Sequence, residues 1–159
     1  MIILGIDPGT RNCGYGILET ERRTILSAGC DVISVNSKLE LVERVSLIYD
    51  ELKKVLLEYQ PDMAAVETIF YGKSIRAAFA LGHVRGVILL LLNRAKIPIY
   101  EYSPREVKKS VVGNGNAHKH QVQYMLSQNL GIDLKGCGDD ATDALAIAMC
   151  HYNRIRITL

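Results

Sequence analysis

Four acidic residues lie at positions where their side chains could share one metal site. Asp7 ends an apolar run that begins at Met1, and Glu67 ends a second, shorter run. Asp140 and Asp143 are three residues apart at the start of a helical pattern, which places them on one helix face. Carboxylates held close together repel one another unless one is protonated or a cation is bound. Oxygen ligands favour Mg²⁺ or Mn²⁺ over zinc, and a pair of such ions promotes in-line displacement at phosphorus.

Each acid taken singly has an ordinary structural explanation. Asp139 or Asp140 could cap the last helix, because aspartate is common at helix N-termini. Glu67 could be an ordinary loop residue after a strand. Convergence of the four acids at one place is what makes a metal site the better interpretation.

The elements that must bring these acids together are predicted from hydrophobic patterning. The near-continuous apolar run at the start is typical of a buried strand, and apolar residues at alternating steps of three and four predict amphipathic helices. Strands are predicted over 1–7, 15–18, 24–35, 63–67 and 97–102, and helices over 41–59, 74–95, 104–112, 118–129 and 139–154. This order predicts a single α/β domain over 1–159, with a five-stranded mixed β-sheet flanked by α-helices on both faces.

The predicted order also places the acids at one edge of the sheet. The first and fourth strands are separated by a helix, so a parallel crossover can lay them side by side. Asp7 and Glu67 then lie at neighbouring carboxyl ends, the edge where α/β sheets usually place their sites. The acids that begin the last helix can join them there.

Composition limits the class of protein. The 159 residues are 48% hydrophobic and 23% charged, which is typical of a globular protein and excludes disorder, collagen and coiled coil. The longest apolar run covers residues 87–92, far short of the about 18 residues of a membrane span, and no signal peptide is expected. Four widely spaced cysteines without a Cys-x-x-Cys pair predict a reduced protein in the cytoplasm and no zinc site.

The net charge of +2 is unevenly distributed. Residues 1–72 carry a net charge of −4, residues 73–120 a net charge of +7 and residues 121–159 a net charge of −1. A block this basic is typical of a surface that binds a polyanion, although a solvated face without a partner explains the charge equally well. Metal-binding acids beside a surface for phosphates together indicate a nuclease.

The chain resembles the RuvC family of Holliday-junction resolvases, within the ribonuclease H-like superfamily. The similarity runs from residue 2 to about residue 152 and consists of short motifs in family order. Any one motif is weak, and the series is specific because order and spacing both agree. The motifs are Gly5-Ile6-Asp7-Pro8-Gly9-Thr10, Gly14-Tyr15-Gly16, Val66-Glu67 with Phe70, Gly82-His83-Val84-Arg85-Gly86, Val107-Lys108, Val111-Val112-Gly113-Asn114-Gly115, Lys119, Gln121-Val122 and Asp140-Ala141-Thr142-Asp143-Ala144-Leu145-Ala146.

The resemblance implies a ribonuclease H-like fold with catalytic metal ligands at Asp7, Glu67, Asp140 and Asp143. It implies two Mg²⁺ ions in each active site, with Mn²⁺ as a substitute. Asp140 is preferred as the third ligand because it begins the Asp-x-x-Asp-Ala-Leu-Ala motif, and Asp139 is left as the predicted cap of the last helix.

The resemblance also implies how DNA is held. Phe70 corresponds to the family's aromatic wedge, which stacks against unpaired bases near the crossover, and Tyr71 could assist it. Lys108 and Lys119 correspond to functional lysines. Lys119 follows a glycine loop near a helix start, where it could contact the scissile or adjacent phosphate and stabilise charge that grows in the transition state. Further backbone contacts, which would position rather than specify, are expected at Lys73, Arg76, Arg105 and Lys109.

The implied activity is resolution of four-way (Holliday) DNA junctions by paired phosphodiester hydrolysis, leaving 5′-phosphate and 3′-hydroxyl ends, in recombination and repair. The implied assembly is a homodimer, because a two-fold substrate suits a two-fold protein. Family members cooperate with a RuvA–RuvB-type branch-migration complex. The predicted helix over 74–95 is apolar on more faces than one sheet can cover, so it is either the dimer interface or a helix wholly buried in one subunit.

Three other interpretations are weaker. Asp7-Pro8-Gly9-Thr10 with Gly14 resembles the first phosphate loop of sugar kinases and chaperone ATPases, but those proteins need a duplicated domain, and no second Asp-x-Gly-Thr occurs. A ribonuclease H-like nuclease for RNA or RNA–DNA hybrid would use the same metals, whereas Phe70 and the apolar helix favour a junction. A non-catalytic junction-binding module is disfavoured, because four mutually repelling carboxylates without metal chemistry would be costly.

Overall fold

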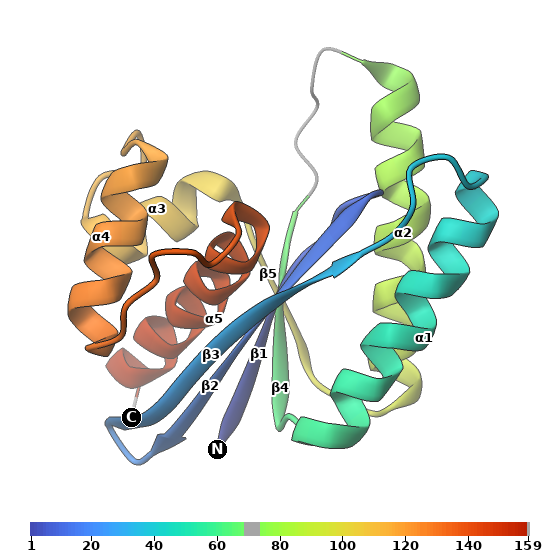
Figure 1. The fold of residues 1–159 in the computed structure, drawn as a ribbon. Coiled ribbons are helices and arrows are strands. Elements are labelled where there is room, and N and C mark those ends of the chain that lie inside the picture. Colours follow the sequence, from blue (N-terminus) through green and yellow to red (C-terminus); the bar gives the residue numbers. More distant parts are fainter. Residues whose placement is uncertain (69–73, 159) are drawn as a thin grey trace.

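A five-stranded sheet includes the two strands that end in Asp7 and Glu67 (Figure 1). The computed structural model describes residues 1–68 and 74–158, so the predicted DNA contacts Phe70, Tyr71 and Lys73 lie outside the described residues. The strands lie in the order β3-β2-β1-β4-β5, with β1 antiparallel to β2 and parallel to β4. Their bounds are β1 (Ile2–Asp7), β2 (Asn12–Glu21), β3 (Thr24–Ser34), β4 (Met63–Glu67) and β5 (Ile99–Tyr102).

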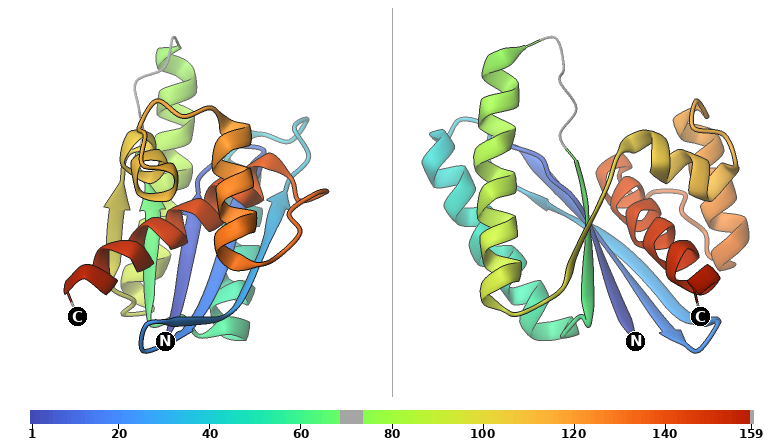
Figure 2. Two further views of the ribbon diagram at one scale, coloured as in Figure 1. Left: turned by 90° about the vertical axis from the view of Figure 1, so that its left-hand side faces the viewer. Right: turned by 180° about the vertical axis from the view of Figure 1, so that it is seen from behind.

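Helices cover both faces of this sheet, as Figures 1 and 2 show. One face is covered by α1 (Leu41–Tyr59) and α2 (Ile75–Arg94). The other face is covered by α5 (Asp139–Thr158), with α3 (Pro104–Val112) and α4 (Lys119–Leu130) packed beside it. The predicted α/β fold with a mixed five-stranded sheet is therefore confirmed.

The structure differs from the prediction mainly at the ends of elements. β2 is longer than the predicted strand over 15–18, because it pairs along its length with both β1 and β3. The prediction that Asp139 caps the last helix is wrong: Asp139 is already the first residue of α5. The preceding residue, Gly138, begins the helical hydrogen bonding, since its carbonyl accepts from the Thr142 N–H at 3.0 Å.

Alternation along the strands decides which way the acids point. In β1, Ile6 belongs to the apolar core beneath α1 and α2, whereas Ile3 belongs to the core beneath α5. In a strand, successive side chains point to opposite faces, so Asp7 points to the α5 face, as Ile3 does. Ala65 packs in the core beneath α5, and Glu67 lies two residues further along β4. The Glu67 side chain therefore points to the α5 face as well.

Close contact with glycines places the start of α5 beside these acids. A Cβ atom added at Gly14 would lie 1.9 Å from the Asp140 carbonyl oxygen, and one added at Gly5 would lie 2.0 Å from the Ala144 carbonyl oxygen. Both distances are far below van der Waals contact, so only glycine lets α5 come this near to β1 and β2. The helix therefore carries Asp140 and Asp143 directly above the end of β1.

The second helix is only partly buried in this fold. Val84, Ile88, Leu91 and Leu92 pack in the core. Its opposite face is exposed and apolar, so the alternative in which this helix is wholly buried in one subunit is wrong. By length and composition alone, α2 is the one described helix apolar enough to cross a membrane, with a mean hydropathy of 1.8 over 18 residues, a test that core helices also pass.

The glycine contact predicts that Gly14→Ala destabilises the protein. The new methyl group must push α5 away from β2, and overpacking of this kind costs about 1–3 kcal/mol of unfolding free energy. Urea unfolding measures the difference.

Gly29→Ala is the matched control. Gly29 also lies in a strand, and nothing lies within 4 Å of an added Cβ there. This variant should stay within about 0.5 kcal/mol of the parent protein. Equal stabilities for Gly14→Ala and the parent would contradict the role assigned to the contact.

Candidate active site

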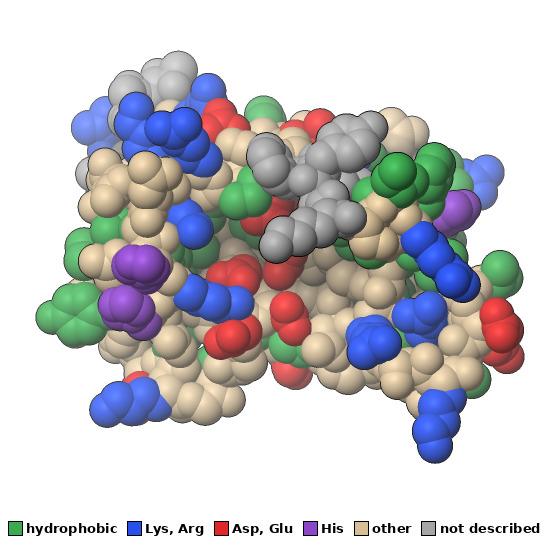
Figure 3. All heavy atoms as spheres, turned by 90° about the horizontal axis from the view of Figure 1, so that it is seen from above, with side chains coloured by type: hydrophobic (Ala, Val, Ile, Leu, Met, Phe, Trp, Pro, Cys, Tyr) green, Lys and Arg blue, Asp and Glu red, His purple; other side chains and the backbone are tan. Residues whose placement is uncertain are grey.

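The structure brings the four predicted acids to the same edge of the sheet. Asp7 and Glu67 end the neighbouring parallel strands β1 and β4, whose register pairs Ile6 with Val66. Asp140 lies in the first turn of α5, and Asp143 follows it three residues later on the same helix. Seen from above, acidic side chains gather near the middle of this face, and Lys and Arg side chains lie on both sides of them (Figure 3).

The acids influence one another strongly. Burial raises the pKa of Asp7 to about 8, and repulsion by Glu67, Asp143 and Asp140 adds to this effect. Burial is also the main cause of the raised pKa of Glu67, followed by repulsion from Asp143. The pKa of Asp143 is raised by burial as well. The four predicted acids therefore lie close to one another. They are half-buried, and a bound cation would relieve their repulsion.

Lys119 places a positive charge directly against this cluster. Its Nζ atom lies 2.7 Å from Asp143 Oδ2 and 3.4 Å from Asp139 Oδ2. Asp139 is therefore a neighbour of the site through Lys119, with its side chain 74% exposed. Within residues 1–68 and 74–158, no three acidic, histidine or cysteine side chains form a ready-made metal cage. Asp7 and Glu67 themselves lie close enough to share a side-chain hydrogen bond.

The donor set nevertheless fits a hard divalent cation. The converging side chains offer carboxylate oxygens, which Mg²⁺ and Mn²⁺ prefer, and they repel one another in the absence of an ion. A hollow of about 300 Å³ opens beside them between β4, α3, α4 and α5. Its lining combines Glu67, Asp143, Lys108 and Lys119 with the apolar residues Pro104, Val107, Val122 and Ala146.

The two predicted functional lysines share this hollow. Lys119 is the first residue of α4, as its predicted place near a helix start requires. Lys108 lies close enough to lower the pKa of Glu67, although burial outweighs this effect. Acids and lysines that line one hollow can hold a phosphate together with its metal ions.

Three other predicted DNA contacts fall within the described residues and do not line the hollow. Arg76 is exposed near the start of α2, and Lys109 is exposed on α3. Arg105 lies against the glycine loop, since a Cβ at Gly115 would meet its Cγ at 2.6 Å. Their contacts with DNA remain predictions.

Two arginines near the acids received no role from the sequence. Arg44 Nη1 donates to the Thr10 carbonyl at 2.8 Å, in the turn that follows Asp7. Arg85 Nε donates to the Glu67 carbonyl at 3.3 Å. Arg85 had a signal, because it lies in the motif that begins at Gly82, whereas the pattern of α1 does not distinguish Arg44 from an ordinary surface arginine.

Comparison with known proteins gives consistent matches over nearly the whole chain. Residues 3–151 match the protein family described as "Crossover junction endodeoxyribonuclease RuvC". A protein of that name from Syntrophomonas wolfei is 42% identical over 158 residues, which cover 99% of this chain and 92% of the relative. The solved structure of Thermus thermophilus RuvC has a TM-score of 0.87 at 31% identity, covering 99% of this chain and 97% of that one. The same protein in complex with a Holliday junction substrate has a TM-score of 0.88 at 30% identity, covering 99% and 96%.

The raised pKa of Asp7 predicts that the metal-free protein loses stability as the pH rises. The carboxyl of Asp7 has a pKa of about 8 in the folded chain and an ordinary value of 3.8 when unfolded. Between these two pH values the folded state binds more protons than the unfolded state, so the protonated Asp7 carboxyl stabilises the fold. This contribution to the free energy of unfolding is complete below the lower pKa and is lost as the pH rises through the folded pKa. Urea unfolding in the presence of a chelator, repeated across this pH range, measures the slope.

Asp7→Asn should flatten that slope, because the amide does not titrate. Asp50→Asn, which changes an exposed aspartate on α1, is the control and should leave the slope unchanged. An unaltered slope in Asp7→Asn would show that Asp7 does not titrate in this range.

Proposed function

The chain belongs to the RuvC family of crossover junction endodeoxyribonucleases, and from this membership we propose that it resolves four-way (Holliday) DNA junctions by metal-dependent hydrolysis of phosphodiester bonds. The observation that carries the proposal is the convergence of four acids and a lysine at one sheet edge. The relative from T. thermophilus has been solved with a Holliday junction substrate, which supports the substrate class.

Asp7, Glu67, Asp140 and Asp143 would hold two divalent ions, with Mg²⁺ as the proposed metal and Mn²⁺ as its substitute. When bound, such ions activate water for in-line attack and stabilise the leaving oxygen. The acids fix where the scissile phosphate must lie, and the products would carry 5′-phosphate and 3′-hydroxyl ends. Asp139 lies on the rim of this site.

Lys119 would contact the phosphate at which attack occurs. Burial alone would lower its pKa, but its contacts with Asp143 and Asp139 outweigh burial and raise it, so the side chain stays charged. A fixed ammonium near the growing negative charge stabilises the transition state more than the ground state. Lys108, which lines the same hollow, would hold an adjacent phosphate.

The remaining contacts would arrange the junction around the site. Phe70 is proposed as the wedge that stacks on unpaired bases, with Tyr71 beside it, and both follow β4 closely in the chain. The proposed contacts to the DNA backbone are Lys73, Arg76, Arg105 and Lys109. These basic residues fall in the part of the chain with the net charge of +7.

A homodimer would place two such sites on the two symmetry-related strands. The outward face of α2 is proposed as the interface, because Ile75, Phe79 and Leu90 are 71%, 68% and 54% exposed. On the same helix, nothing lies within 4 Å of a Cβ added at Gly82 or Gly86, so another backbone can come near. A RuvA–RuvB-type complex is the proposed functional partner, and the four free cysteines support a cytoplasmic location.

The activity is tested with a synthetic four-way junction, a matched duplex and an RNA–DNA hybrid, each with and without Mg²⁺. Cleavage of the junction alone, and only with Mg²⁺, is the expected result. Preferential cleavage of the hybrid would favour the RNA-directed alternative. Junction binding without cleavage in any divalent metal would favour a binding module.

Asp7→Asn should abolish junction cleavage while junction binding persists. The substitution removes a charged metal ligand but leaves the DNA-facing lysines in place, so chemistry and affinity should separate. A gel assay for cleavage and a mobility-shift assay for binding measure the two effects. Normal cleavage by this variant in Mg²⁺ would overturn the assignment of Asp7.

Phe79→Glu should convert the dimer to monomers, because it buries a charge in the proposed apolar interface. Sedimentation at micromolar concentration measures the change. Leu57→Glu is the control, since Leu57 is 69% exposed on α1 and lies outside the interface. A parent protein that sediments only as a monomer would remove the dimer from the proposal.

A further inference from the structure

Arg85 connects α2 to the backbone at Glu67. Its Nε atom donates to the Glu67 carbonyl at 3.3 Å, and its Nη2 atom forms an ion pair with the Glu101 carboxylate of β5. The Arg85 side chain is only 18% exposed. One guanidinium therefore bridges the ends of two neighbouring strands from the α2 face of the sheet.

The register of the sheet explains why these two contacts meet. β4 pairs with β5 so that Val66 lies beside Glu101 and Glu67 lies beside Tyr102. Val66 packs in the core beneath α1 and α2, so its neighbour Glu101 shares the face from which Arg85 approaches. The next backbone bond, from the Thr68 N–H to the Tyr102 carbonyl at 2.9 Å, continues the pairing past Glu67.

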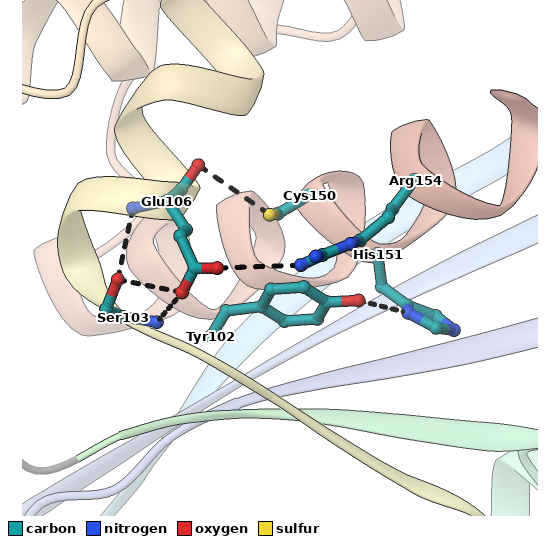
Figure 4. Close-up of polar contacts among 6 residues, drawn as sticks. All are labelled: Tyr102, Ser103, Glu106, Cys150, His151 and Arg154. Atoms are coloured by element: carbon teal, nitrogen blue, oxygen red, sulfur yellow. Dashed lines mark hydrogen bonds and ion pairs between the residues drawn. The ribbon is translucent and has the colours of Figure 1, made fainter.

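The opposite face of β5 is held by α5, as Figure 4 shows. The Tyr102 hydroxyl lies 2.7 Å from His151 Nδ1, and His151 is 1% exposed. Burial, with a further effect from Arg154, lowers the pKa of His151 to about 4, so the ring that shares this hydrogen bond is neutral. At the next residue, Ser103 and Glu106 cap α3, and Arg154 reaches Glu106 at 3.5 Å.

Arg85 contacts a different part of Glu67 from the other charged groups around it. Asp143 repels the Glu67 carboxylate from the far side of the site, and the groups that favour the ionised form of Glu67 are Asp7, Lys119 and Lys108. Arg85 contacts the main-chain oxygen of Glu67 instead. It therefore bears on where the residue is placed, while the lysines bear on its charge. A ligand that contributes to a metal site must be held to about half an ångström, which is the work of such supporting contacts.

We propose that Arg85 is a positioning residue for the metal site. It fixes the backbone of Glu67 against repulsion by Asp143 and is itself aligned by Glu101. The proposal rests on the assignment of Glu67 as a metal ligand in the proposed function. It makes Arg85 a determinant of metal affinity, and it assigns Arg85 no contact with DNA.

The test compares Arg85→Gln with Arg94→Gln, which changes an exposed arginine on the same helix. Mn²⁺ binding, followed by calorimetry on the whole protein, should weaken about tenfold in Arg85→Gln and stay unchanged in the control. In junction cleavage, the Mg²⁺ concentration for half-maximal rate should rise by a similar factor and the rate should recover at saturating Mg²⁺. Junction binding without metal should be unaltered. A merely structural role would lower thermal stability without shifting the Mg²⁺ dependence.

Two further variants keep the proposal testable if Arg85→Gln does not fold. Glu101→Gln removes the partner that aligns Arg85, and Arg85→Lys keeps the charge but cannot bridge both groups. Each should weaken Mn²⁺ binding in the same direction but by less. Parental Mn²⁺ affinity in both of these variants, or in a folded Arg85→Gln, would overturn the proposal. If the parent protein cuts no junction while Arg85→Gln still weakens Mn²⁺ binding, the proposed function fails and the role of Arg85 stands.

Discussion

Mutual repulsion among four half-buried acids is the constraint to which the rest of the structure responds. Asp7 and Glu67 are held by the parallel pairing of β1 with β4, and Asp143 is held by Lys119. Burial, and after it the repulsion that remains, raises the pKa of Asp7 to about 8. The fold thus keeps its charged groups in place by main-chain pairing and by opposite charge, and it leaves an ion as the means of full relief.

The hydrophobic patterns of the strands predict much of the fold and the edge of the sheet at which the acids meet. Apolar runs that end in Asp7 and Glu67, with one helix between them, suffice to predict a parallel pair and a shared edge, and the helical pattern over 139–154 adds the last two acids. The order of strands and helices followed from the same patterns. Side-chain contacts between residues that are distant in the chain could not be predicted from these patterns. The ion pair of Lys119 with Asp143, for example, spans 24 positions.

Local signals also failed where a residue had two possible roles. Asp139 has the character of a cap, yet the helix already includes it, and its side chain turns toward Lys119. β2 extends past the apolar core of its sequence because both neighbours supply backbone partners. Arg85 lies in a family motif that assigned it no role, and only the approach of α2 to the ends of β4 and β5 shows which groups it contacts.

The glycine contact beneath α5 has a consequence for how such a site can change over generations. Backbone lies on backbone at Gly5 and Gly14, so the distance between helix and strands is set by hard atomic radii, not by a choice of rotamers. Side-chain packing can be retuned a methyl group at a time, but this spacing cannot. The position of α5, which bears Asp140 and Asp143, therefore cannot change in small steps. Sequence differences within such a lineage should accumulate instead on the outer helices and loops, where no comparable contact limits substitution.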